Sequence, residues 1–228
     1  IKIKEIANMI IKMTNSNLKI KVEKKRNRKK ISEEERIKRD KKIGFELIVE
    51  TAMGMANLDS ICTGSGRIES LHFGYADYAA SVRMRTTNVG GPNPDYAILT
   101  HETPEGRLIH WNDLWHNPIS QMAILGRKHG LRVIDGPFGD FSDPDGYNAQ
   151  GKRTAILGCE GKWAIHPNQV ELANDLFTPK ETTIERARKI VSLMKEAQDH
   201  HDGAVTLDGK LIDAASVRQA EQLIDQQE

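Results

Sequence analysis

The chain has few of the features that mark secreted or membrane-spanning proteins. Only two of its 228 residues are cysteines, Cys62 and Cys159, and they lie far apart. Such spacing gives neither a disulfide framework nor a zinc site, which favours a reduced, cytoplasmic protein. No segment approaches the roughly 20 apolar residues of a membrane helix. The chain also lacks a positively charged start followed by an apolar block, so no secretory signal is expected. We therefore expect a soluble globular protein with no membrane partner.

Aromatic residues are also scarce, and the positive charge is concentrated in one segment. Aromatic side chains make up 5% of the chain, whereas residues 19–42 hold 13 Lys or Arg against 5 Asp or Glu. A basic run attracts phosphates or nucleic acid. KKRNRKK has no interleaved aromatic side chains for base stacking, however, which argues against a nucleic-acid partner. We expect residues 1–42 to form a helix at 3–13 and a partly disordered basic linker.

The middle of the chain, residues 43–178, alternates between strand-like and helix-like patterns. FELIVETA predicts a strand buried on both faces. Further strands are expected in ESLHFG, LRVIDGPFG and CEGKWAIHP, and helices in ANLDSICTG, ADYAASVRM, 114–130, 143–158 and NQVELANDLF. Four alternations of strand and helix indicate an α/β fold with a parallel sheet or barrel.

The tail, residues 179–228, predicts a helical appendage. Thr178 and Glu181 have the spacing of a capping box, with Pro179 at the first helical position. A loop rich in small residues, HHDGAVTLDGKLID, follows this helix, and AASVRQAEQLI forms a last short helix.

Glu50 and Asp77 are the most informative pair, because each stands where a predicted strand ends. In a parallel α/β fold, ligands bind beyond the carboxyl ends of the strands. Buried carboxylates are costly unless a cation or hydrogen-bond donors compensate them. Two of them at one mouth provide hard oxygen ligands for Mg²⁺. The alternative is that each acid caps the following helix or pairs with an arginine.

Other polar residues admit simpler interpretations. Asp135, Asp140 and Asp143 either bind a metal or shape a phosphate loop, but a rigid, turn-rich loop explains them better. His166 is a candidate acid or base, or a histidine fixed by hydrogen bonds beside a ligand. Asp213 fits a helix N-cap.

Taken together, these segments resemble the citrate lyase β-subunit-like (HpcH/HpaI aldolase) family over about residues 44–228. The motifs that carry the resemblance are ELIVETAMGMAN, FGYADYAAS, MRTTNVGGPNPDY, HWNDLWH, DGPFGDFSDPDGY, GKWAIHPNQVELAN and KLIDAASVRQAE. The resemblance implies a (β/α)8 TIM-type barrel with a C-terminal lid, assembled as a homotrimer or homohexamer. Its carboxyl-terminal half, about four strands, would be present here together with the lid.

The resemblance also assigns roles by position. Glu50 and Asp77 match the acids that bind Mg²⁺, with Mn²⁺ as an alternative ion. Ala76 and Asp77 match one substrate-contacting stretch, and Ile165 and His166 match a second. Asp213 matches a catalytic lid acid that reaches a neighbouring subunit's site, which replaces the helix-cap interpretation.

The implied reaction is reversible cleavage of malyl-CoA or β-methylmalyl-CoA, both acyl-CoA thioesters, to glyoxylate and acetyl-CoA or propionyl-CoA. The alternatives are a malyl-CoA thioesterase and an inactive scaffold subunit.

Three departures from the family pattern stand out. The family's amino-terminal half barrel, with an arginine that steadies the enolate, has no counterpart in residues 1–43, and the chain starts at Ile1. We therefore expect a fragment or a partner-dependent half barrel, inactive by itself. Arg83 replaces a usual glycine and Tyr75 a small residue or proline, and both are expected to alter the mouth of the site.

Overall fold

The computed structural model describes residues 43–199 and 203–225. The helix expected at 3–13 and the basic linker at 19–42 lie outside these residues. Contacts divide the chain into two compact units, one reaching to Ala173 and one starting at Asn174. The sequence placed the start of the appended tail at residue 179, after the helix that spans this division.

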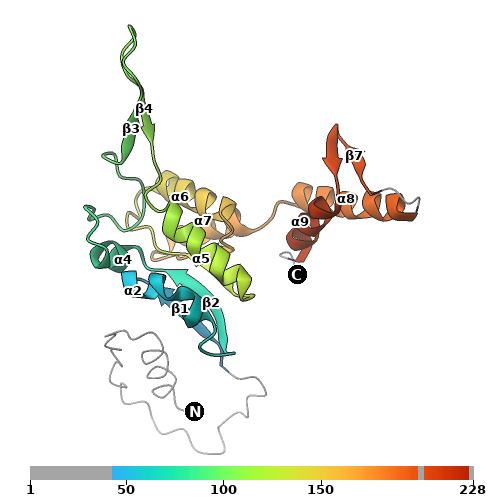
Figure 1. Ribbon diagram of the computed structural model, residues 1–228, viewed down its shortest axis with the longest axis horizontal. Coiled ribbons are helices and arrows are strands. Elements are labelled where there is room, and N and C mark those ends of the chain that lie inside the picture. The colour runs from blue at the N-terminus through green and yellow to red at the C-terminus, as the bar shows by residue number, and fades with distance from the viewer. Residues whose placement is uncertain (1–42, 200–202, 226–228) are drawn as a thin grey trace, which may run out of the picture. The chain divides into compact units, whose positions relative to one another are not determined.

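The first unit is built on a parallel four-stranded sheet (Figure 1). Its strands, in spatial order, are β1 (Phe45–Val49), β2 (Ile68–Phe73), β5 (Arg132–Asp135) and β6 (Gly161–Lys162). The helices of this part of the chain are α2 (Ala52–Ala56), α3 (Leu58–Cys62), α4 (Tyr75–Ser81), α5 (His116–Lys128), α6 (Pro144–Ile156) and α7 (Asn168–Phe177). The predicted α/β fold with a parallel sheet is confirmed. The half barrel stays a prediction.

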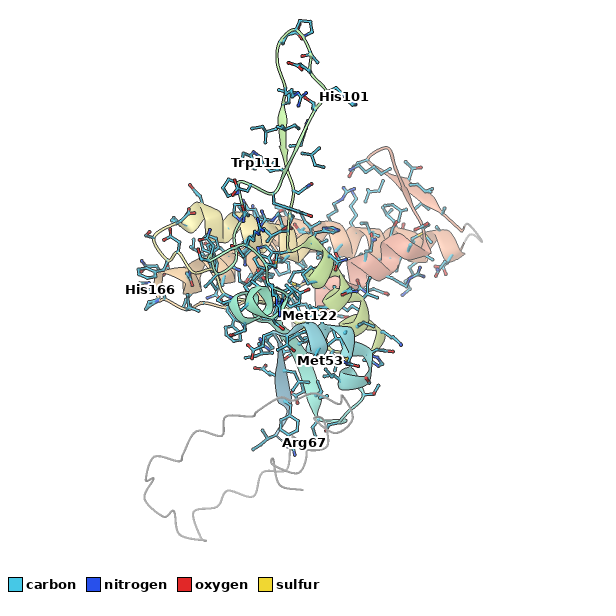
Figure 2. All side chains as sticks on the ribbon, turned by 60° about the vertical axis from the view of Figure 1, so that its left-hand side comes forward. Met53, Arg67, His101, Trp111, Met122 and His166 are labelled. Atoms are coloured by element: carbon cyan, nitrogen blue, oxygen red, sulfur yellow. The ribbon has the colours of Figure 1, made fainter. Side chains whose placement is uncertain are left out.

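One face of the sheet holds the core of this unit. Leu71, Phe73 and Val133 are fully buried there, and Ile119 and Met122 of α5 are buried with them (Met122 is labelled in Figure 2). The sequence prediction that the first strand is buried on both faces is wrong. Alternate residues of a strand point to opposite faces, and Ile48 of β1 is 47% exposed.

Helix α4 ends in a Schellman motif whose left-handed residue is Arg83. The Met84 N–H donates to the Ala79 carbonyl (2.8 Å), and the Arg83 N–H donates to the Ala80 carbonyl (3.2 Å). Glycine is the usual residue at this position because it has no Cβ, and Arg83 has a φ of 60°. Its side chain is exposed and makes no core contact. The presence of a Cβ at this position strains the backbone.

We expect Arg83→Gly to raise the free energy of unfolding by about 1 kcal/mol, because it removes the left-handed strain of a residue with a Cβ. Urea denaturation of both proteins measures the difference. Arg85→Gly is the control, since Arg85 is equally exposed but has no positive φ. It should lower stability instead. A destabilised Arg83→Gly protein would contradict the explanation.

A hairpin that the sequence analysis missed projects from the first unit (Figures 1 and 2). It consists of β3 (Ala97–Leu99) and β4 (Ile109–Trp111), which pair antiparallel with Ala97 opposite Trp111 and Leu99 opposite Ile109. Residues that lie opposite one another share a face, so one face of the hairpin is entirely apolar. Trp111 is nevertheless 61% exposed.

The second unit contains α8 (Glu181–Asp199), α9 (Ala214–Asp225) and a second hairpin of β7 (Val205–Leu207) and β8 (Lys210–Ile212). Met194, Leu207 and Ile212 form its small core. The sequence analysis expected a loop in place of this hairpin. The signal was present, because Asp208-Gly209 is the dipeptide that two-residue hairpin turns favour, and both residues have positive φ (51° and 72°).

None of the helices in the described ranges is both long and apolar enough to span a bilayer. Cys62 and Cys159 are free and buried, and burial raises the pKa of the Cys62 thiol to about 11. Neither thiol is therefore ionised near neutral pH in this fold.

Candidate functional site

Glu50 follows the last residue of β1 and is half-buried. It does not cap the next helix. The Thr51 hydroxyl does so, accepting a hydrogen bond from the Gly54 N–H (2.9 Å). The capping alternative for Glu50 is therefore excluded, and its carboxylate is available at the carboxyl end of the sheet.

Asp77 lies in the first turn of α4, four residues past the end of β2, and is exposed. Two hydrogen bonds hold this helix against the end of β1 and the segment that follows β1. The Gly74 N–H donates to the Val49 carbonyl (3.0 Å), and the Ala52 N–H donates to the Ser81 hydroxyl (2.9 Å). These bonds link the segments that carry the two acids at both ends of α4.

Gly74 is required for this approach. A Cβ added to Gly74 would lie 2.5 Å from the Cβ of Glu50, which no real side chain could accommodate without displacement. Glycine allows close backbone approach because it has no side chain. Position 74 thus lets the helix that carries Asp77 lie directly beside Glu50.

The Asp77 carboxyl group is close enough to Glu50 to affect the ionisation of Glu50. Burial raises the pKa of Glu50, and the charge of Asp77 and a hydrogen bond between the two side chains raise this pKa further. A cation at the pair would favour the ionised form of both groups. The acids that the sequence predicted to converge are therefore brought together.

The donor set suits a hard cation. Residues 43–199 and 203–225 contain no cluster of three or more His, Cys, Asp or Glu side chains that could enclose a metal. The acid pair alone would leave most ligand positions to water or substrate. Mg²⁺ is commonly bound in this way, through one or two carboxylates while it retains waters. The residues present thus fit a magnesium ion.

The other predicted substrate-contacting residues are spread over two segments. Ala76 is exposed and directly precedes Asp77. Ile165 is exposed, and its N–H donates to the Gln169 side-chain oxygen (2.8 Å). The pairing fixes the backbone of the loop between β6 and α7.

His166 is held in a defined orientation. Its ring stacks on Phe141, with 4.6 Å between the centroids, and its Nδ1 lies 3.3 Å from the Asn168 N–H. This arrangement agrees with the interpretation of a histidine fixed by its neighbours. Figure 2 shows His166 at the periphery of the first unit.

The aspartates after β5 have structural roles. Asp140 accepts hydrogen bonds from the Ser142 N–H (2.9 Å) and hydroxyl (2.5 Å). Asp143 caps α6 by accepting from the Gly146 N–H (2.9 Å). The metal or phosphate-loop interpretation of these residues is not supported, and the rigid-turn alternative is.

Asp135 lies at the centre of a buried polar network that the sequence analysis did not predict. Its Oδ2 lies 2.7 Å from the Lys162 Nζ, and both side chains are fully buried. Its Oδ1 accepts from the Tyr75 hydroxyl (2.6 Å), and Oδ2 also accepts from the Thr154 hydroxyl (3.0 Å). The Lys162 ammonium additionally donates to the Gly136 carbonyl (3.0 Å). The only sequence signal was a lysine in a short predicted strand.

Tyr75 does not face the mouth of the site, so it can alter the mouth only through the residues that it contacts. Its side chain is fully buried, and its ring packs against that of Trp115 with 4.7 Å between the ring centroids. Burial and the neighbouring Asp135 charge raise its pKa well above the ordinary value. The tyrosine therefore acts as a neutral hydrogen-bond donor inside the core.

Asp213 in the second unit is a helix N-cap, as its sequence context first indicated. Its Oδ1 accepts from the Ala215 N–H (3.0 Å), the Ser216 N–H (2.9 Å) and the Ser216 hydroxyl (3.1 Å). These bonds lower the pKa of Asp213, with the Ser216 contacts as the largest cause. All of them use Oδ1, and Oδ2 accepts no hydrogen bond from any residue in the described ranges.

Comparisons with known proteins identify similar sequences and a similar fold. The model of the HpcH/HpaI aldolase/citrate lyase family matches residues 5–167. The chain is 45% identical over 190 residues to an L-malyl-CoA/β-methylmalyl-CoA lyase of Cereibacter sphaeroides, covering 83% of this chain and 58% of that one. It is 37% identical over 187 residues to a malyl-CoA/β-methylmalyl-CoA/citramalyl-CoA lyase of Chloroflexus aurantiacus, covering 81% and 53%.

The fold is similar to that of the CitE protein from Mycobacterium tuberculosis, crystallised with magnesium, acetoacetate and coenzyme A. The TM-score is 0.59 at 18% identity, covering 79% of this chain and 59% of that one. This chain thus spans less than two thirds of the length of the relatives that it matches.

Proposed function

Because the chain belongs to the HpcH/HpaI aldolase/citrate lyase family, we propose that it forms part of a Mg²⁺-dependent lyase that cleaves malyl-CoA or β-methylmalyl-CoA. The products would be glyoxylate and acetyl-CoA or propionyl-CoA. The single observation that carries this proposal is the close approach of the Asp77 segment to Glu50 at the carboxyl end of the sheet, which Gly74 allows and which raises the pKa of Glu50. The named activities of the similar lyases support the choice of substrate.

Glu50 and Asp77 would hold the metal, with water and substrate oxygens at the remaining positions. A bound Mg²⁺ supplies Lewis-acid stabilisation of negative charge on substrate oxygens. The protein contributes the geometry, since Gly74 allows the two acids to approach and the bond between Ala52 and Ser81 ties their segments together. Mn²⁺ should bind the same pair.

Asp213 is the proposed general acid/base at the carbon that leaves as a thioester enolate. Its N-cap bonds are compatible with this role, because they hold Oδ1 and leave Oδ2 for proton exchange. General acid–base catalysis of this kind contributes about 10²–10⁴-fold in rate. We infer that Asp213 acts from a neighbouring subunit in a homotrimer or homohexamer, as its resemblance to the family's lid acid implies.

Ala76, Ile165 and His166 are the proposed substrate contacts. Ala76 is exposed next to Asp77, and Ile165 and His166 are fixed by Gln169 and Phe141 respectively. The two buried free thiols support a reducing, cytoplasmic location.

The proposal predicts that lyase activity requires a divalent ion. Malyl-CoA is incubated with the full-length native protein, and glyoxylate release is measured before and after removal of metal by a chelator. We expect activity to fall to background and to return when Mg²⁺ or Mn²⁺ is added. Unchanged cleavage in the presence of the chelator would refute the mechanism.

The same assay separates the alternatives. Release of malate without glyoxylate would assign a thioesterase. Absence of both products, together with stable binding to a complete homologue, would assign a scaffold subunit. For residues 1–228 alone we expect metal binding without turnover.

A further inference from the structure

The Lys162–Asp135 ion pair is not readily explained by stability. Both side chains are fully buried, and Lys162 Nζ lies 2.7 Å from Asp135 Oδ2. Removing two charges from water costs about as much as their attraction returns, and apolar residues of similar size often stabilise a core as well or better. A buried pair with several further hydrogen bonds therefore suggests a positional role.

The network is directly connected to the helix that carries Asp77. Lys162 holds the Asp135 carboxylate from β6, and Asp135 accepts the Tyr75 hydroxyl through its other oxygen at 2.6 Å. Tyr75 is the first residue of α4, and Asp77 is the third. Because residues two positions apart on a helix point in nearly opposite directions, Tyr75 is buried in the core while Asp77 remains exposed.

Apart from the bond between the Gly74 N–H and the Val49 carbonyl, the start of helix α4 depends on Tyr75. The helix has only seven residues, and its N-cap residue, Gly74, has no side chain to provide a capping bond. The bond between Tyr75 and Asp135 therefore fixes the first turn, whereas the bond between Ala52 and Ser81 fixes the last residue. Loss of the first anchor would let the turn that carries Asp77 shift relative to Glu50.

We propose that Tyr75, Asp135 and Lys162 form a positioning network that sets the distance between the two metal-binding acids. This inference rests on the proposed metal site. None of the three residues contacts the metal, and each acts through the placement of Asp77. Supporting groups that orient metal ligands typically contribute 10–100-fold in metal affinity.

The test is Mn²⁺ binding to Tyr75→Phe, measured by titration calorimetry and by electron paramagnetic resonance of free Mn²⁺. This change removes only the hydroxyl and retains the packed ring. We expect the Kd for Mn²⁺ to rise about 10-fold. Tyr147→Phe is the matched control, since Tyr147 is also buried and its hydroxyl donates to the Trp163 carbonyl (3.1 Å) rather than to Asp135. Its Kd should stay within about 2-fold of the wild-type value.

Glu50→Gln tests whether the measured Mn²⁺ binding takes place at the acid pair. This variant should show no Mn²⁺ binding signal. If Tyr75→Phe binds Mn²⁺ as tightly as the wild type, or if Tyr147→Phe weakens binding equally, the positioning role is refuted while the metal site stands. If the wild type does not bind Mn²⁺, or if Glu50→Gln binds it normally, the proposed function fails and the inference fails with it.

Discussion

Replacing Glu50 with glutamine is expected to reduce the kcat/KM for malyl-CoA cleavage by about 10³-fold at fixed Mg²⁺. The change keeps the size of the side chain but removes one of the two charges that would hold the ion. Metal stabilisation of transition-state charge contributes several kcal/mol, and a loss of about 4 kcal/mol corresponds to about 10³ in rate. The Kd for Mg²⁺ should rise by at least about 10²-fold.

The same variant should behave differently in the absence of metal. The pKa of Glu50 is raised in the folded protein, so ionisation of this acid costs stability once the pH exceeds its ordinary pKa. Glutamine removes that cost, and the metal-free variant should therefore melt at a higher temperature than the wild type at pH 7. Thermal unfolding with and without Mg²⁺ measures both effects, and Mg²⁺ should no longer raise the melting temperature.

Glu46→Gln is the matched control, because Glu46 lies on β1, the strand that Glu50 directly follows, and pairs with the exposed Arg132 (3.3 Å) instead of with Asp77. Its activity and Mg²⁺ affinity should stay within about 2-fold of the wild type, since exposed ion pairs contribute little. Equal losses in the two variants would show that a general change in charge, and not the acid pair, is responsible.

Asp213→Asn should lower kcat by about 10²–10⁴-fold while leaving metal affinity unchanged. Asparagine caps helices about as well as aspartate, so α9 should still begin at the same place. What is lost is the ability to exchange a proton. Glyoxylate release measures kcat, and exchange of the acetyl-CoA methyl protons with deuterated solvent measures the proton-transfer step directly.

Asp208→Asn provides the control in the same unit. Asp208 has a positive φ in the turn between β7 and β8, which asparagine also tolerates, and its ion pair with Arg186 is exposed. This variant should retain full activity. A kcat for Asp213→Asn within about 3-fold of the wild type would restrict Asp213 to its capping role.

Local patterns in the sequence were sufficient to predict most of the first unit. Strand and helix alternate as expected, and α7 has the predicted bounds. Glu50 and Asp77 could be paired in advance because parallel strands end at one edge of a sheet. The amino-acid sequence did not predict that Ile48 is exposed, since an apolar run has the same appearance whether one face or both are covered.

The features that were missed depend on partners distant in sequence or on turn geometry. Lys162 pairs with Asp135, 27 positions earlier, and Tyr75 lies 60 positions before that same aspartate. No spacing rule connects such residues. The hairpin at β7 and β8 was predictable from Asp208-Gly209, whereas the one at β3 and β4 has a longer connection.

The buried ion pair limits which substitutions are acceptable over evolutionary time. Loss of Lys162 alone would leave the Asp135 charge buried without a partner, and loss of Asp135 alone would do the same to the lysine. Either change typically lowers the free energy of unfolding by about 3–5 kcal/mol. Joint replacement by apolar residues would preserve or even improve heat resistance, yet it would leave the Tyr75 hydroxyl without its acceptor. A lineage selected only for thermal tolerance could therefore lose both charges together and retain the fold while helix α4 is held less firmly.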